Sequence, residues 1–234
     1  MKKLTSEHLA ILQKQTQTYF FKGYDIYFIH GWFCAYLSSP SDSEEDLVIP
    51  MYLVLDEEKI IDENVFTKFI DGLMDMYTDL ADKIYEQNKL IKPLVNIEHP
   101  NNFLNNSPTE LEQVNLLNWL YGYLSGYLSI GADITEYCTD DALLTEKFFP
   151  ALFTVCVCFL ILNKQITANK YYTGDVLIDF NELCEDVTSM WEADDTASIS
   201  DQVETTTLMD GLNNLVQALS TIFFVVRKAE EDRS

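Results

Sequence analysis

Histidine is the residue type in this chain that could transfer protons or bind a metal near neutral pH, because its ordinary pKa is about 6.5. The chain has three histidines, His8, His30 and His99. His30 is the one that we single out, because it directly precedes Gly31 in the segment 29–38, IHGWFCAYLS. Two interpretations are open for it: a core histidine bonded to a neighbouring group, which is the more common case, and a ligand or proton carrier.

The segment 120–129, LYGYLSGYLS, is similar to the segment that contains His30. In an ungapped alignment the glycines coincide, an aromatic residue follows each, and a small residue stands four positions later. On a helix that spacing places both small residues on one face, one turn apart. Because glycine inside a helix costs about 1 kcal/mol relative to alanine, we expect close packing of two helices to offset it. The crossing is predicted at Gly31, Ala35, Gly122 and Gly126.

Other patterns that carry chemistry are absent from the sequence or have the wrong spacing. Cys156 and Cys158 are two positions apart, so on a helix they point in different directions and make a poor metal-binding pair. The segment 126–131, GYLSIG, lacks the spacing of a nucleophile elbow, and no glycine-rich phosphate loop occurs. We therefore predict no catalytic residue, no metal site and no cofactor.

Carboxylates are the most abundant chemical feature of the chain. There are 38 acidic and 15 basic residues, which gives a formal net charge of −23. Such a charge repels nucleic acid and anionic membrane surfaces, and it favours a basic protein or a cationic ligand. Solubility alone would explain the charge equally well. The acidic residues that we predict to bind a partner lie in two loops: Asp42, Glu44, Glu45, Asp46, Glu192, Asp194, Asp195, Asp201 and Glu204.

The hydrophobic pattern of the sequence predicts helices along almost the whole chain. The longest amphipathic segment is residues 62–92, and Ser107 with Pro108 predicts the start of the helix that carries the second glycine motif. Residues 47–55 fit neither a helix nor a strand well. The other predicted helices cover residues 4–21, 25–38, 107–130, 142–149, 151–163, 175–191 and 207–228.

The predicted architecture is therefore all-α: a single, orthogonally packed domain of about seven helices with two loosely repeated halves. Residues 1–24 form an N-terminal helix, residues 25–228 the domain, and residues 229–234 a tail. Within the domain, halves at about 25–92 and 107–228 are joined by an irregular loop, 93–106, that is rich in Asn and Pro.

Cysteine usage and hydropathy indicate a soluble protein of a reducing compartment. The five cysteines form an odd set without a disulfide-like framework. The N-terminal residues lack the apolar stretch of a signal peptide. The most apolar run, residues 148–162, is shorter than the roughly 20 residues that a membrane span needs. We expect a cytoplasmic protein that does not contact membranes.

The order of the motifs resembles that of the YecA/YgfB-like family of bacterial proteins. His30, Gly31 and Trp32 begin the pattern, an acidic loop and a long amphipathic helix follow, and Trp119, Gly122 and Tyr123 form the second motif. An acidic linker and an apolar helix close it, so the resemblance covers roughly residues 20–228. It implies an all-helical cytoplasmic fold without an established enzymatic activity.

This chain departs from the family's pattern in two respects. YecA-type members often carry a C-terminal, cysteine-rich zinc-binding segment, whereas this chain has no cysteine after Cys184. The chain is therefore closer to the YgfB-like branch. The first acidic loop also lacks the Trp that such proteins often have there.

The function predicted from the sequence is that of a non-catalytic adaptor or regulator that binds a protein partner, a basic one such as a nucleic-acid-binding factor. Direct binding to nucleic acid is not expected. One alternative is a small-molecule or enzymatic site at the helix crossing, lined by His30, Trp32, Trp119 and Tyr123. Another alternative is a structural homodimer that uses exposed aromatic residues such as Phe20 and Phe21.

Overall fold

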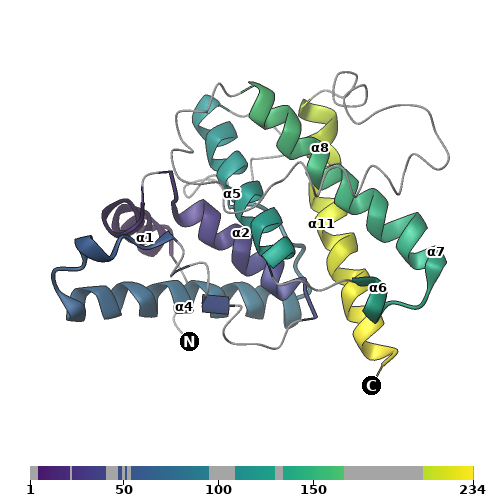
Figure 1. The fold of residues 1–234 in the computed structure, drawn as a ribbon, viewed down its shortest axis with the longest axis horizontal. Helices are drawn as coiled ribbons and strands as arrows, with labels where there is room; N and C mark the ends of the chain where they lie inside the picture. Colours follow the sequence, from purple (N-terminus) through teal and green to yellow (C-terminus); the bar gives the residue numbers. More distant parts are fainter. Residues whose placement is uncertain are drawn as a thin grey trace.

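The structure is a computed structural model that describes residues 5–21, 23–40, 47–48, 51, 54–94, 109–129, 134–165 and 208–233 (Figure 1). Within these residues the one extended pairing is an isolated antiparallel bridge between Phe20 and Leu55. The prediction of an all-α single domain is confirmed. Its helical elements are α1 (Ser6–Tyr19), α2 (Ile26–Leu37), η1 (Glu57–Lys59), α4 (Glu63–Tyr85), α5 (Glu110–Ser129), α6 (Ile134–Tyr137), α7 (Asp141–Leu143), the π-helical turn η2 (Leu144–Phe148), α8 (Phe149–Gln165) and α11 (Leu208–Glu231).

Helices α2 and α5, which carry the two glycine motifs, pack against each other at the centre of the molecule (Figure 1). Helix α2 is apolar around its whole circumference, and all of its residues except Tyr36 are buried. A helix with that composition belongs in the interior of a domain. Asp25 caps its N-terminus by accepting hydrogen bonds from the backbone N–H groups of Tyr27 (2.9 Å) and Phe28 (3.1 Å).

Helix α4 runs along one side of this central pair, and α1 packs on α4 (Figure 1). The apolar residues of α4 recur at helical spacing, which explains why one face of the helix is buried and the other is solvated. Tyr19 at the end of α1 packs its ring against those of Phe66 and Phe69, with centroid distances of 5.6 and 5.3 Å. The buried stripe of α4 consists of Phe69, Leu73, Met76, Leu80 and Ile84.

Helices α8 and α11 lie side by side on the other side of the central pair (Figure 1). One side chain of α11 also reaches the end of α2. The Arg227 guanidinium donates to the Leu37 carbonyl oxygen (2.8 Å) and lies over the ring of Tyr85, with its carbon 5.1 Å from the ring centroid. A cation at this place stabilises the last turn of α2, where the carbonyl groups lack intrahelical partners.

Two predicted helix ends differ from those observed. Helix α4 ends at Tyr85 instead of residue 92, because Asn88 has a positive φ of 49° and the Lys89 N–H turns back to the Lys83 carbonyl oxygen (2.9 Å). Helix α5 begins at Glu110 with a capping box in which the Thr109 hydroxyl and the Glu112 carboxylate each accept from the other residue's backbone. The predicted cap, Ser107, lies outside the described residues.

The apolar helix begins before Pro150 instead of after it, which corrects the predicted start at residue 151. Residues Asp141–Asn163 form a continuous helical stretch of 23 residues. Proline cannot donate a backbone hydrogen bond, and its ring crowds the carbonyl group four residues earlier. The π-helical turn η2 directly before Phe149 has the wider hydrogen-bond spacing that accommodates such a residue.

This stretch is long and apolar enough to cross a membrane by length and composition, so the length argument made from residues 148–162 does not hold. It is the one such helix in the described part of the chain. Of its most apolar window, 56% is buried inside the protein, where α8 packs on α11. The core helices of soluble proteins have the same composition.

Three further segments complete the comparison with the predicted elements. Residues 47, 48, 51 and 54 have helical backbone, although the pattern of residues 47–55 fits no element. Helix α11 runs three residues beyond the predicted end to Glu231, and Ala229 is 3% exposed within it. The predicted helix at 175–191, the acidic residues 42–46 and most of the loop 93–106 lie outside the described residues.

Candidate functional site

Gly31 and Gly122 occupy the points where the backbones of α2 and α5 approach most closely. A Cβ atom added to Gly31 would stand 2.1 Å from the Trp119 carbonyl oxygen, and one added to Gly122 would stand 2.0 Å from the Phe28 carbonyl oxygen. At Gly126, an added Cβ would stand 2.9 Å from the Cβ of Ala35. The structure thus brings together the four small residues that the sequence analysis assigned to the crossing.

His30 and Trp119 are joined across this crossing by a buried hydrogen bond. The Trp119 Nε1–H donates to His30 Nδ1 at 2.8 Å, and the Cys34 sulfur lies 3.6 Å from the same nitrogen. Because an indole nitrogen can only donate, His30 Nδ1 is the acceptor and the ring proton is on Nε2. His30 is 8% exposed and Trp119 is fully buried.

Burial, with a smaller contribution from the charge of Lys83, lowers the pKa of His30 from 6.5 to about 3. Burial also raises the pKa of the Cys34 thiol well above its usual range. At neutral pH the imidazole is therefore uncharged and the thiol protonated, which is the opposite of a thiolate–imidazolium nucleophile. The geometry gives His30 the role of a bonded core residue.

Trp32 and Tyr123, the other two residues predicted to line a pocket, are also buried at this crossing, with exposed fractions of 1% and 0%. The ring of Tyr123 stacks on that of Trp119, with a centroid distance of 5.4 Å and an interplanar angle of 13°. The packing of these rings accounts for their burial without a ligand. A ligand pocket at the crossing stays a prediction.

The hydroxyl group of Tyr123 is buried and makes no hydrogen bond of ordinary geometry within the described residues. Burial raises the pKa of this phenol, and the nearby Ser38 hydroxyl partly offsets that rise. Ser38 Oγ donates to the Cys34 carbonyl oxygen at 2.7 Å. A buried hydroxyl that lacks a well-formed hydrogen bond is energetically costly.

Asp25 is a second titratable group beside the crossing. Its carboxylate accepts from the Asn118 side-chain amide at 2.7 Å, in addition to the two backbone N–H groups that it caps. Desolvation raises the pKa of Asp25 from 3.8 to about 6, and these three hydrogen bonds hold the rise in check. The carboxylate joins the start of α2 to α5, which is a structural role.

The nine acidic residues predicted to bind a partner lie in residues 41–46 and 166–207, outside the described residues. The described part contains a different acidic surface, on α4. We call it the carboxylate stripe; it consists of Asp71, Asp75, Asp79 and Asp82 of α4 and of Glu86, the residue at the C-cap of α4. Steps of three and four residues place these side chains on one helix face, opposite the buried stripe.

Most members of the carboxylate stripe make no ion pair with another described residue. Lys83 pairs with Asp79, and no ion pair in the described part of the chain involves Asp71, Asp75, Asp82 or Glu86. Like charges four residues apart destabilise a helix, and acidic residues near a helix C-terminus are unfavourable to its dipole. The stripe therefore lowers the stability of α4.

The sequence analysis missed this surface because it considered α4 only through its apolar residues. The signal was present: the acidic residues follow the same three- and four-residue steps on the opposite face. Loops with consecutive acidic residues are more conspicuous in a sequence, although a folded helix presents its charges in a fixed arrangement.

Among the described residues, no group of three or more His, Cys, Asp or Glu side chains is arranged to hold a metal ion. Phe20, predicted to be an exposed aromatic residue, is 2% exposed and packs against Phe69, which corrects that prediction. Phe21 is 47% exposed. No protein-family model, curated protein or solved structure matches this chain.

Proposed function

We propose that this chain is a non-catalytic acidic adaptor or regulator, which binds a basic protein through carboxylates on its surface. The observation that carries the proposal is the carboxylate stripe of α4, four of whose five members have no ion pair within the described residues. A row of unneutralised charges lowers helix stability, and a cationic partner would remove that penalty.

The net charge of the whole chain supports the same proposal. A formal charge of −23 attracts basic proteins over distances of about a Debye length and repels nucleic acid. A basic partner such as a nucleic-acid-binding factor fits this field, and the nine acidic loop residues would extend the surface that it meets. The neutral, bonded state of His30 at the crossing gives less support to an enzymatic site there.

The proposal places the protein in the cytoplasm. Cys34, Cys138, Cys156 and Cys158 are buried cysteines outside any disulfide, as is usual in reducing compartments. Membership of the YecA/YgfB-like family is part of the proposal, on the order of the motifs alone. A structural homodimer has weaker support now that Phe20 is seen in the core.

Affinity capture with matched variants tests the proposal. The stripe variant carries Asp71→Asn, Asp75→Asn, Asp82→Asn and Glu86→Gln, and it leaves the Asp79–Lys83 pair intact. The control variant removes the same number of charges from exposed residues outside α4, by Glu136→Gln, Asp141→Asn, Glu146→Gln and Asp232→Asn. Wild-type protein and both variants are used to capture proteins from host lysate at low salt.

We expect wild-type protein and the control variant to retain a partner at low salt. The stripe variant should lose this partner, and high salt should release it. Salt weakens this contact because it screens exposed charges. Equal retention by the two variants would remove the stripe from the proposal. An empty eluate from wild-type protein at low salt would contradict the adaptor function itself.

A further inference from the structure

A cavity of about 270 Å³ lies between α1 and α4, beside the carboxylate stripe. Its apolar part is formed by Ile11, Leu12 and Gly72. The two helices touch at its floor, where a Cβ added to Gly72 would stand 2.8 Å from a terminal methyl group of Leu12. Leu12 is 4% exposed, whereas Ile11 is 50% exposed and offers an apolar surface without cover within the described residues.

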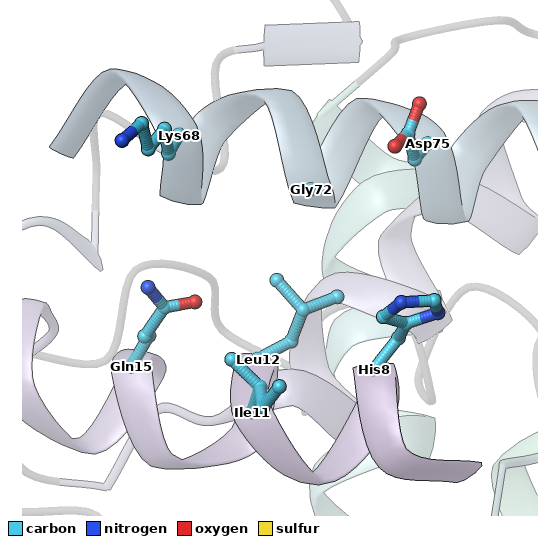
Figure 2. A pocket seen from close by; sticks show the side chains of 7 residues that line it. All are labelled: His8, Ile11, Leu12, Gln15, Lys68, Gly72 and Asp75. Carbon is cyan, nitrogen blue, oxygen red and sulfur yellow. The ribbon is translucent and has the colours of Figure 1, made fainter. Parts of the chain in front are cut away.

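Polar side chains mark the two ends of this groove (Figure 2). Lys68 and Gln15 lie at one end, and Asp75 and His8 lie at the other (Figure 2). Asp75 is exposed and is also a member of the carboxylate stripe. The groove therefore has an apolar middle, a carboxylate at the end that joins the stripe, and hydrogen-bond donors at the opposite end.

Charge complementarity decides which occupant fits this groove. A cationic side chain beside Asp75 would also meet the field of Asp71 and Asp79, which lie one turn away on either side along α4. At the other end, the ammonium group of Lys68 and the amide of Gln15 suit carbonyl or carboxylate oxygen atoms. A segment with an apolar residue followed by a basic one matches the apolar middle and the Asp75 end of the groove. Its carbonyl oxygen atoms match Lys68 and Gln15 at the other end.

We infer that the groove between α1 and α4 is a docking site for a basic, amphipathic segment of the partner protein, whose apolar side chain covers Ile11 and whose cation pairs with Asp75. This inference rests on the proposed function and gives it a location. The apolar anchor supplies selectivity that a stripe of exposed charges lacks, since exposed ion pairs contribute little individually. Salt then weakens the contact by screening its charged part.

Fluorescence anisotropy with synthetic peptides tests the inference on the full chain. The probe is a labelled peptide of about 14 residues, in which Leu recurs at three- and four-residue steps and Lys fills the opposite face of an amphipathic helix. A Lys/Ser peptide of the same charge and a Glu/Leu peptide of the same apolar pattern are the control probes. The protein variants are Ile11→Ser and Asp75→Asn, compared with Val65→Ser and Asp71→Asn.

Each control variant matches its partner in chemistry and differs in place. Val65 is 42% exposed on α4 and does not line the groove, and Asp71 is in the stripe outside the groove. We expect the Lys/Leu peptide to bind at least about tenfold more tightly than the Lys/Ser peptide. Ile11→Ser and Asp75→Asn should each weaken binding of the Lys/Leu peptide at least about fivefold, and more than their matched control variants do.

Three results would overturn the inference. In the first, the Lys/Leu and Lys/Ser peptides bind with equal affinity, and Asp71→Asn and Asp75→Asn have equal effects. The carboxylate stripe would then be a cation-binding surface, and the groove would have no part in binding. Equal affinity for the Glu/Leu peptide would show non-specific apolar binding. Failure of both basic peptides to bind at low salt would remove the groove and count against the proposed function as well.

Discussion

His30 is the residue for which the sequence left two roles open. A histidine beside a glycine motif is a fair candidate for proton transfer, and the sequence analysis left that alternative open. In the structure its Nδ1 atom is occupied by the Trp119 indole at 2.8 Å, and its pKa is lowered to about 3. Sequence spacing could pair the two motif helices, but it could not show which side-chain atoms meet between them.

The low pKa of His30 makes it a source of acid sensitivity. The unfolded chain takes up a proton near pH 6.5, whereas the folded protein does so only near pH 3, so stability falls as the pH drops through that window. In the variant His30→Gln, the side-chain carbonyl oxygen can still accept the hydrogen bond from the Trp119 indole, but the group that titrates has been removed. Between pH 7 and pH 5, we expect the variant to lose about 2 kcal/mol less unfolding free energy than wild type.

Urea unfolding of the two proteins at both pH values measures this difference. The comparison between proteins is needed because the raised pKa of Asp25, about 6, acts in the opposite direction and stabilises the fold as the pH falls. An identical loss of stability in wild type and His30→Gln would show that the imidazole is not held neutral at the crossing.

At the scale of the elements, the crossing of α2 and α5 is the contact on which the fold depends. Gly31→Ala and Gly122→Ala would each place a methyl group about 2 Å from a backbone carbonyl oxygen on the other helix. Backbone atoms cannot move aside as a side chain does, so we expect each substitution to cost at least about 3 kcal/mol, despite the better helix propensity of alanine.

Gly72→Ala is the matched control for this prediction. The added methyl group at Gly72 meets a terminal methyl group of Leu12, which can move by rotating its side chain. Thermal and urea unfolding should show a change within about 1 kcal/mol for this variant. If Gly31→Ala and Gly122→Ala are equally mild, the helices do not cross as closely as described.

The apolar periodicity in the sequence was sufficient to predict the helical class and the main helices, because burial of one face is what fixes a helix in a domain. It was not sufficient for the ends. The break at Asn88 depends on a left-handed residue, and the continuation through Pro150 depends on the π-helical turn before it. Both features depend on local backbone conformations, which the periodicity of apolar side chains does not indicate.

The carboxylate stripe makes its own prediction at this scale. Because its like charges repel along α4, and Asp82 and Glu86 also lie at the helix C-terminus, neutralising them should stabilise the protein. We expect the stripe variant to unfold at higher urea concentration than wild type, by about 0.5–1.5 kcal/mol in total. The control variant, whose charges lie outside α4, should gain less. A destabilised stripe variant would mean that these carboxylates make contacts that stabilise the fold.

At the scale of the whole molecule, an all-α domain carries a formal net charge of −23. The sequence analysis placed the partner-binding residues in the two acidic loops, and those predictions stay untested because the loops lie outside the described residues. The stripe and the groove beside it are instead parts of one described surface. Their juxtaposition at Asp75 links a charged surface to an apolar anchor, as in selective protein interfaces.

The most direct test of the adaptor account is the amount of partner that the stripe variant retains in affinity capture, relative to the control variant. Both variants lose the same charge, so their net fields are alike and only the position of the carboxylates differs. The account predicts that the control variant retains the partner at low salt and the stripe variant does not, while both stay folded. Equal retention by the two variants would contradict the assignment of the carboxylate stripe as the partner-binding surface.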